Sequence, residues 1–233
     1  MDKILGWLDN FWYHYKWHVL VGLFIVVFLF VSIGQMIDKE KVDVYILYAG
    51  PTAFMAAEIY EIQDAFETIM PDLNGDGQKV VQFIDITVLT DEQIADNMEK
   101  ADAEGVDYKP DMEYIANARQ KFKLQLAAGD AYIVLADPGM YAEDKGVGIY
   151  QSLESLGVSA EHAYDEYSVV FRDTDFGSYM PVFQKLPEDT LMCFRTMGVT
   201  SKARGKKEQE KHDNQLVMFK EMVNFTLSDG SDD

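Results

Sequence analysis

VDVYILYAG, residues 42–50, is the stretch that reveals most about the fold of this chain. It is an almost continuous apolar run that ends at Pro51, a pattern typical of a strand buried on both faces. In residues 52–70 the apolar side chains recur at alternating steps of four and three, which predicts an amphipathic helix. KVVQFIDITVL, residues 79–89, is again rich in β-branched residues and predicts a second strand.

The same order of elements continues along the chain. Thr90 and Gln93 fit a capping box at the start of a helix that extends to about Ala103. A longer helix follows Pro110 and ends at Gly129. The apolar positions that we place on one face of this longer helix are Met112, Ile115, Phe122 and Leu126.

Three further segments complete the predicted domain. DAYIVLADPG, residues 130–139, predicts a third buried strand, and residues 168–173 and 191–197 predict two more. The final helix is predicted from the spacing of Leu216, Phe219, Val223 and Leu227. Because apolar strands alternate with helices, we expect an α/β domain whose mostly parallel sheet carries helices on both faces.

WHVLVGLFIVVFLFVSIGQMI, residues 17–37, contains no charged residue. At 1.5 Å per residue it is about 31 Å long, which matches the hydrocarbon core of a bilayer. We therefore predict a transmembrane helix, preceded by an amphipathic interfacial tail (1–16) and followed by the α/β domain (38–228) and an acidic tail (229–233). A cleaved signal peptide is the alternative, because the most apolar part is about 15 residues long.

The charge of the chain restricts its partners and its location. Lys and Arg number 20 against 40 Asp and Glu, and a net charge of −20 argues against nucleic-acid binding. The single Cys193 excludes an internal disulfide and a site with several thiolates. Two lysines flank the span on each side, so the positive-inside rule does not choose an orientation. We expect a single-pass protein of the cell membrane, with the N-terminus inside and the acidic domain extracellular.

FKLQLAAGDAYIVLADPG, residues 122–139, resembles the first lobe of type II extracytoplasmic (periplasmic-type) solute-binding proteins, as does the YQSLESLG segment, residues 150–157. The resemblance covers roughly residues 42–157. The membrane entry, residues 11–24, is similar to that of single-span surface proteins of Gram-positive bacteria. The resemblance implies one periplasmic-binding-protein-like lobe, because about 75 residues after Gly157 are too few for a second lobe.

The carboxyl end of the third predicted strand is a candidate ligand site. Asp137, Gly139 and Tyr141 follow this strand, and α/β sheets commonly hold ligands at that edge. These three residues are therefore candidates for binding a small ligand. The alternative is that Asp137 only caps a turn.

DLNGDGQ, residues 72–78, is a candidate calcium loop, because oxygen donors alternate along it and Gly77 permits a sharp turn. The candidate ligands are Asp72, Asn74, Asp76 and Gln78. Phe83 stands where an EF-hand needs an acid, so the loop is similar instead to the calcium loop of galactose-type binding proteins. That similarity implies a distant acid to complete the site, and Val80 replaces one ligand. The alternative is a turn that needs no ion.

The chain shows no HExxH, GxSxG, Walker or paired Cys/His pattern. We therefore expect a non-catalytic, membrane-anchored recognition module that binds a protein partner or a small ligand at the cell surface. One alternative is a structural or assembly subunit of a cell-envelope complex, and another is a hydrolase of envelope polymers. The only basic cluster is expected to be a solvated loop before the last helix and consists of Lys202, Arg204, Lys206 and Lys207.

Overall fold

The computed structural model describes residues 2–37, 42–158 and 161–227. The chain divides into two compact units, Met1–Lys41 and Val42–Asp233, and each is described by itself. The first unit contains one helix, α1 (Asp2–Ile37), so the predicted tail and span are continuous. The stretch Trp12–Phe30 of α1 is long and apolar enough to cross a membrane. Residues 229–233, the predicted acidic tail, lie outside the described residues.

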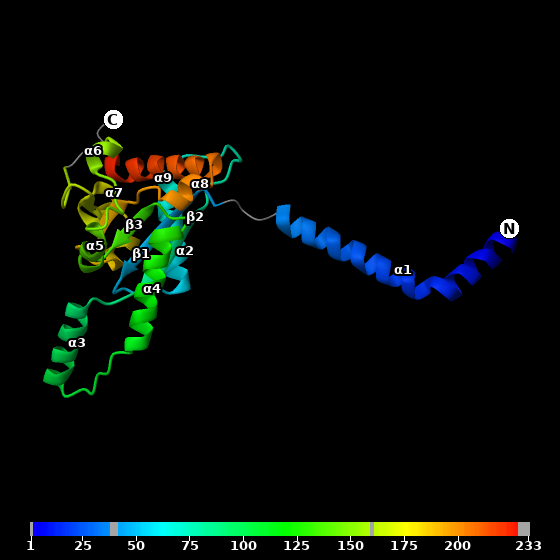
Figure 1. Cartoon of the computed structure of the whole chain (residues 1–233), viewed down its shortest axis with the longest axis horizontal. Helices are drawn as coiled ribbons and strands as arrows, with labels where there is room; N and C mark the ends of the chain where they lie inside the picture. The colour runs from blue at the N-terminus through cyan, green and yellow to red at the C-terminus, as the bar shows by residue number, and fades with distance from the viewer. Residues whose placement is uncertain (1, 38–41, 159–160, 228–233) are drawn as a thin grey trace, which may run out of the picture. The chain divides into compact units, whose positions relative to one another are not determined.

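The second unit is an α/β fold built on a five-stranded sheet in its described part, with strand order β2-β1-β3-β5-β4 (Figure 1). The strands are β1 (Val44–Gly50), β2 (Val81–Thr87), β3 (Ile133–Ala136), β4 (Ser168–Val170) and β5 (Leu191–Phe194). All five lie within segments that the sequence predicts to be strands. The predicted strand over 168–173 stops at Val170, and residues Phe171–Asp173 form a short 3-10 helix, η1.

Helices connect these strands. They are α2 (Ala56–Ile69), α3 (Asp91–Glu104), α4 (Met112–Ala128), α5 (Pro138–Lys145), α6 (Leu153–Leu156), α7 (Asp175–Tyr179), α8 (Val199–Ala203) and α9 (Lys206–Asn224), with a second 3-10 turn η2 (Pro181–Lys185). The predicted helices α2, α3, α4 and α9 are confirmed. The last helix ends at Asn224, before Leu227. Of the basic cluster, Lys202 lies in α8, Arg204 lies in the turn that follows it, and Lys206 and Lys207 lie in the first turn of α9.

The expectation of a mostly parallel sheet is only partly correct, because the sheet is mixed. Strand β1 pairs in parallel with β2 and β3, whereas β5 is antiparallel to both β3 and β4. The register pairs Val170, at the end of β4, with Leu191, at the start of β5. The chain between them therefore stays at one edge of the sheet, and β5 must run back. If β5 were parallel to β4, the segment between them would have to cross to the opposite edge of the sheet before β5 begins.

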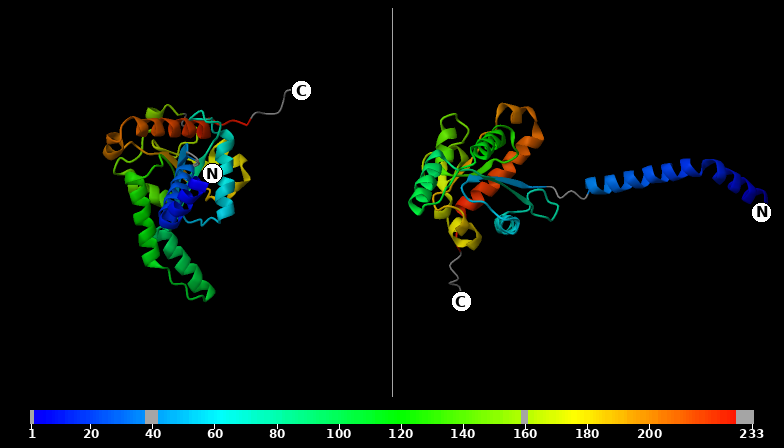
Figure 2. Two further views of the ribbon diagram at one scale, coloured as in Figure 1. Left: turned by 90° about the vertical axis from the view of Figure 1, so that its right-hand side faces the viewer. Right: turned by 90° about the horizontal axis from the view of Figure 1, so that it is seen from below.

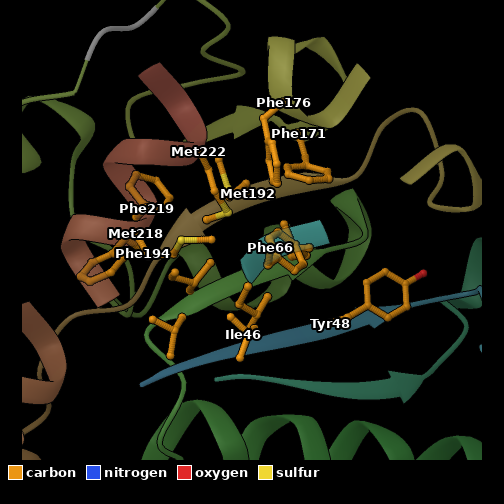
Figure 3. Packing of buried hydrophobic residues seen from close by; sticks show 14 of the residues in the cluster. Ile46, Tyr48, Phe66, Phe171, Phe176, Met192, Phe194, Met218, Phe219 and Met222 are labelled. Atoms are coloured by element: carbon orange, nitrogen blue, oxygen red, sulfur yellow. The ribbon is translucent and has the colours of Figure 1, made fainter. Parts of the chain in front are cut away.

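Alternate strand residues point to opposite faces of the sheet and build two buried clusters. In β1, Ile46 and Tyr48 belong to the cluster that includes Phe66 of α2 and side chains of α9 (Figure 3). Leu47 and Ala49 belong to the second cluster, which includes side chains of α4 and α5. The predicted arrangement of helices on both faces is therefore confirmed, and Figure 2 shows it from two further directions.

Cys193 of β5 belongs to the second cluster and is completely buried. Burial raises the pKa of its thiol well above the ordinary value, because a thiolate would lose its hydration there. The Sγ atom lies 3.6 Å from the carbonyl oxygen of Val134 on the neighbouring strand. The thiol is therefore part of the packed core.

Candidate functional site

The carboxyl edge of the parallel strands is where the sequence predicts a ligand. Asp137 directly follows β3 and caps the N-terminus of α5, because its Oδ1 accepts a hydrogen bond from the backbone N–H of Gly139 at 2.8 Å. Its Oδ2 accepts a hydrogen bond from Nε2 of Gln93 at 2.7 Å. Asp137 is buried, and both of its carboxylate oxygens have partners within the protein. These contacts support the alternative interpretation, in which Asp137 caps a turn.

Gly139 brings the starts of α3 and α5 into direct contact. A Cβ atom at this position would lie 2.7 Å from Cγ2 of Thr90, which is too close for two carbon atoms. Thr90 itself caps α3, and its hydroxyl accepts a hydrogen bond from the Gln93 backbone at 3.2 Å, while Gln93 Oε1 accepts one from the Thr90 N–H at 3.0 Å. The predicted capping box is confirmed. The space beside Gly139 is filled by the protein's own side chains.

Tyr141, the third candidate ligand residue, is buried in the cluster under α5. Its hydroxyl donates a hydrogen bond at 2.8 Å to Asp165, a residue that the sequence did not single out. Asp165 also accepts hydrogen bonds from Lys145 at 2.7 Å and from the hydroxyl of Ser168 at 2.9 Å. Asp137, Gly139 and Tyr141 therefore have structural contacts of their own. Ligand binding by these three residues stays a prediction.

Several hydrogen-bond donors lower the pKa of the Asp165 carboxyl group. Burial of Asp165 opposes its ionisation, but the donors from Lys145, the Tyr167 backbone, Tyr141 and Ser168 outweigh that effect and lower its pKa to about 2. The carboxylate is the common acceptor for α5 and for the segment that leads into β4. Asp165 therefore holds these two segments together.

The candidate calcium loop, residues 72–78, is internally hydrogen-bonded. The two carboxylate oxygens of Asp72 accept from the backbone N–H groups of Gly75 at 2.8 Å and Gly77 at 3.0 Å. Asn74 Oδ1 accepts from the Asp76 N–H at 2.8 Å, and Asp76 Oδ1 accepts from the Gln78 N–H at 3.0 Å. These contacts are typical of a turn rich in Asx and Gly, which is the alternative interpretation of the loop.

Asp43, just before β1, is the distant acid that contacts this loop. Its Oδ1 accepts from Nδ2 of Asn74 at 2.6 Å, and its Oδ2 accepts from the Val80 N–H at 3.0 Å. Burial raises the pKa of Asp43, and the nearby carboxylates of Asp76 and Asp72 raise it further. Among the described residues, no group of three or more His, Cys, Asp or Glu side chains is placed to hold a metal ion. Calcium binding by Asp72, Asn74, Asp76 and Gln78 stays a proposal.

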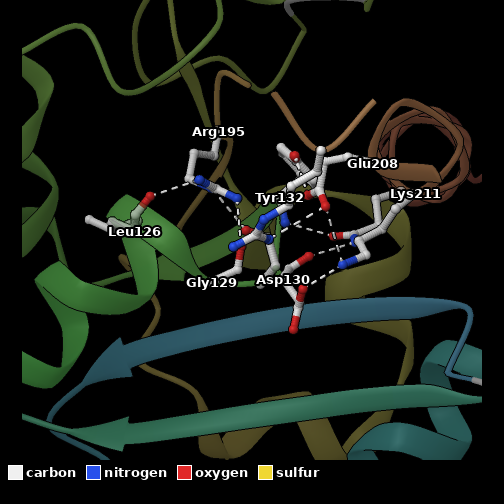
Figure 4. A network of polar contacts seen from close by, with 10 residues as sticks. Leu126, Gly129, Asp130, Tyr132, Arg195, Glu208 and Lys211 are labelled. Atoms are coloured by element: carbon white, nitrogen blue, oxygen red, sulfur yellow. Dashed lines mark hydrogen bonds and ion pairs between the residues drawn. The ribbon is translucent and has the colours of Figure 1, made fainter. Parts of the chain in front are cut away.

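A second polar network lies at the opposite ends of these strands and centres on Arg195 (Figure 4). The guanidinium group is buried and donates to three backbone carbonyls: Nε to Ala131 at 3.0 Å, Nη1 to Leu126 at 2.8 Å and Nη2 to Gly129 at 2.9 Å. The carbonyls at the end of a helix lack partners within the helix, and a cation is favourable there. Arg195, which directly follows β5, therefore caps the C-terminus of α4.

The network continues from Tyr132 to α9. The Tyr132 hydroxyl donates to Glu208 Oε1 at 2.8 Å, and Glu208, which is buried, lies 3.7 Å from Nζ of Lys211. Lys211 also pairs with Asp130, and Gln215 Oε1 accepts from the Tyr132 N–H at 2.6 Å. Sequence reasoning missed this network. The only signal was an arginine within an otherwise apolar strand segment, LMCFRTM (191–197).

The most exposed part of the second unit is formed by α3, the loop 105–111 and the first part of α4. We call residues 91–124 the α3–α4 arm; Figures 1 and 2 show that α3 stands away from the sheet, whereas α4 runs back over it. Phe122 of α4 packs in the second buried cluster. Between residues 91 and 114 the only buried residue is Ile94. Met112, which the sequence places on the same face as buried Ile115, is 57% exposed because α4 begins beyond the sheet.

Large apolar side chains and surface hollows occur together on the α3–α4 arm. Its exposed apolar side chains are Met98, Val106, Met112, Tyr114 and Leu124. A hollow of about 460 Å³ follows α4, and Met112, Ile115, Arg119, Lys123 and Leu124 contribute to its lining. A second hollow of about 400 Å³ lies between α4 and the end of β2. Clustered apolar exposure of this kind is typical of a binding surface.

The two helices of the arm carry opposite charges. Helix α3 contains six acidic residues and one lysine, whereas α4 contains Arg119, Lys121 and Lys123 with the single acid Glu113. The ion pair between Arg119 and Asp91, 2.7 Å long, joins the helices only at the base of the arm. Beyond this pair the acidic residues of α3 continue towards its outer end, whereas Lys121 and Lys123 continue along α4 towards the sheet. These side chains are exposed, and Lys123 pairs with Glu143 of α5 at 3.6 Å.

Comparison of the chain with protein-family models, with curated proteins and with solved structures found no match.

Proposed function

We propose that the chain is a membrane-tethered recognition module that binds a protein partner through the α3–α4 arm and catalyses no reaction. The observation that carries the proposal is the exposure of large apolar side chains on α3 and on the outward side of α4. Met112 is 57% exposed and Leu124 is 61% exposed, and both line the hollow along α4. Burying one such side chain against a partner contributes about 1.5–3 kcal/mol.

The carboxyl edge of the sheet supports the choice of the arm over a small-ligand site. The polar groups nearest to the end of β3 are paired with one another, since Asp137 accepts from both Gly139 and Gln93. A small ligand at that edge would have to displace these hydrogen bonds. A partner on the arm would displace only water.

The location of the module is also part of the proposal. Helix α1 supplies one segment that is long and apolar enough to cross a membrane. We place the N-terminus inside and the second unit outside the cell, because acidic residues meet little resistance to translocation. Protease added to intact cells should then remove the second unit and spare an N-terminal tag. Protection of the second unit would contradict this orientation.

The recognition role is tested by site-specific photo-cross-linking in the full chain. A photoreactive amino acid at Leu124, in the arm, should yield a discrete protein adduct in cells of the source organism. The matched control is Tyr60, which is 66% exposed on α2, a helix on the opposite face of the sheet from α4. Adducts of the same mass and yield at both positions, or none at Leu124, would contradict the proposal.

A further inference from the structure

The two helices of the α3–α4 arm are complementary to each other in charge. Helix α3 has six acidic residues against one basic residue, and α4 has three basic residues against one acidic residue. Each helix also exposes a large apolar side chain, Met98 on α3 and Met112 on α4, which are 45% and 57% exposed. Either helix alone would therefore suit a partner helix with the properties of the other.

Within one chain this complementarity is used only at the base of the arm. Arg119 donates to Asp91 at 2.7 Å and to the carbonyl oxygen of Leu89 at 2.8 Å. Glu99 and Asp102 lie towards the outer end of α3, whereas Lys121 and Lys123 lie on the sheet side of Arg119 along α4, and all four are exposed to solvent. Lys123 also pairs with Glu143 of α5 at 3.6 Å. The outer surfaces of both helices are therefore accessible to another molecule.

We propose that the partner of the arm is the arm of a second copy of this chain, with α3 of each copy lying against α4 of the other. The inference rests on the proposed recognition role and specifies its partner. A two-fold pair makes the same contact twice, so an acidic and a basic helix on one arm are both matched at once. Helix α3 has 14 residues and the exposed part of α4, residues 112–124, is nearly as long, so both helices extend about 20 Å.

A different protein would leave part of this surface unmatched. A basic helix would complement α3 but would face Lys121 and Lys123 on α4, and an acidic helix would do the reverse. The net charge of −20 repels two copies at long range, but that repulsion is screened beyond about 8 Å at physiological ionic strength. The arm contacts act at shorter distances, and confinement to one membrane would raise the effective concentration of the copies.

Charge reversal in the full chain, solubilised in detergent and measured by sedimentation, tests this inference. One variant reverses α3 with Glu99→Lys and Asp102→Lys, and a second reverses α4 with Lys121→Glu and Lys123→Glu. The wild-type chain should dimerise, and each variant alone should dimerise at least tenfold more weakly, because like charges then face each other twice. An equimolar mixture of the two variants should regain the dimer, since each unlike pair is restored.

The matched control reverses two lysines outside the arm, Lys206→Glu and Lys207→Glu on α9, and should leave the dimer unchanged. A monomeric wild-type chain, unaltered dimerisation of both variants, or a mixture that fails to recover would overturn the inference. Cross-linking from Leu124 separates the two proposals. An adduct with a different protein would retain the recognition role and remove the self-pairing, whereas no adduct at all would remove both.

Discussion

The guanidinium carbon of Arg195 lies 4.5 Å from the centre of the Tyr132 ring, and both side chains are buried. Burial lowers the pKa of Arg195, yet the group keeps its charge because its ordinary pKa is so high. The charge is held by three carbonyl dipoles and the face of one ring. These two residues join the end of α4 to β3 and β5.

Replacement of Arg195 by Met should lower the free energy of unfolding by about 3 kcal/mol or more, because three buried carbonyls then lose their donors. Urea unfolding followed by circular dichroism measures this change. The control is Arg204→Met, since Arg204 is 43% exposed in its side chain and lies 3.5 Å from Glu208. Because buried Glu208 would keep Tyr132 and Lys211 as partners, loss of Arg204 should cost less, about 1 kcal/mol. Equal effects of the two substitutions would contradict the capping role of Arg195.

Replacement of Gly139 by Ala should destabilise the second unit by about 1–3 kcal/mol, because the new Cβ would overlap with Cγ2 of Thr90. Thr90→Ser removes that methyl group and keeps the hydroxyl that caps α3. The double variant should therefore recover most of the lost stability, and a double-mutant cycle from urea unfolding measures the coupling. Additive effects of the two substitutions would show that the close contact between α3 and α5 is absent.

Asp165 should make the stability depend on pH in the acidic range. Its pKa in the folded state is about 2, whereas an unperturbed Asp has a pKa of about 3.9. Its contribution is thus present above about pH 4 and is lost as the pH falls towards the folded value. Asp165→Asn should be less stable at pH 7 and should lose less stability between pH 4 and pH 2.

The measurement for Asp165 is the urea-unfolding free energy at several pH values, compared with that of the wild-type chain. Asp173→Asn, a substitution at an exposed position, serves as the control. Its unfolding free energy should change with pH as that of the wild type does. If the stability of the Asp165→Asn variant changes with pH as that of the wild type does, the contacts described do not lower the pKa of Asp165.

Asp43 should stabilise the 72–78 loop whether or not an ion is present. Asp43→Ala leaves Nδ2 of Asn74 and the Val80 N–H without their acceptor. The free energy of unfolding in EDTA should therefore be about 1–3 kcal/mol lower than that of the wild type. Asp76→Ala is the control, because it removes one hydrogen bond at an exposed position and should have a smaller effect. A larger effect of Asp76→Ala than of Asp43→Ala in EDTA would contradict this role.

The calcium proposal is decided by the same proteins. If the loop binds calcium, millimolar calcium should raise the Tm of the wild-type chain by a few degrees relative to EDTA. The Asp76→Ala variant should then show no such rise. An unchanged wild-type Tm would remove the calcium proposal and leave the hydrogen bonds of Asp43 and Asp72 to hold the loop.

Local features of the second unit could be predicted from the sequence because they depend on neighbouring residues. The apolar run in β1 identifies a buried strand, and Thr90 and Gln93 are only three residues apart, so their capping box is readable directly. Gly129 was expected to end α4, and it does. Its necessity is steric, because a Cβ atom there would lie 2.4 Å from the Gln125 carbonyl oxygen.

Features that depend on distant residues could not be predicted. The direction of β5 follows from the pairing of Leu191 with Val170, which no local pattern encodes. The acid beside the 72–78 loop is Asp43, 31 positions away from Asn74 along the chain, and nothing in the sequence distinguishes it from the other acids. Met112 has the spacing of a core residue, but its exposure depends on where the sheet ends.

The enclosure of Cys193 in the sheet has a practical consequence for the chain. Because its only sulfhydryl is buried and protonated, the folded chain offers no accessible thiol to thiol-specific alkylating reagents. A cysteine introduced at any exposed position would become its sole handle for a spin label or a fluorophore. Conversely, the onset of maleimide labelling at Cys193 would time the opening of the β3–β5 region without any engineered probe.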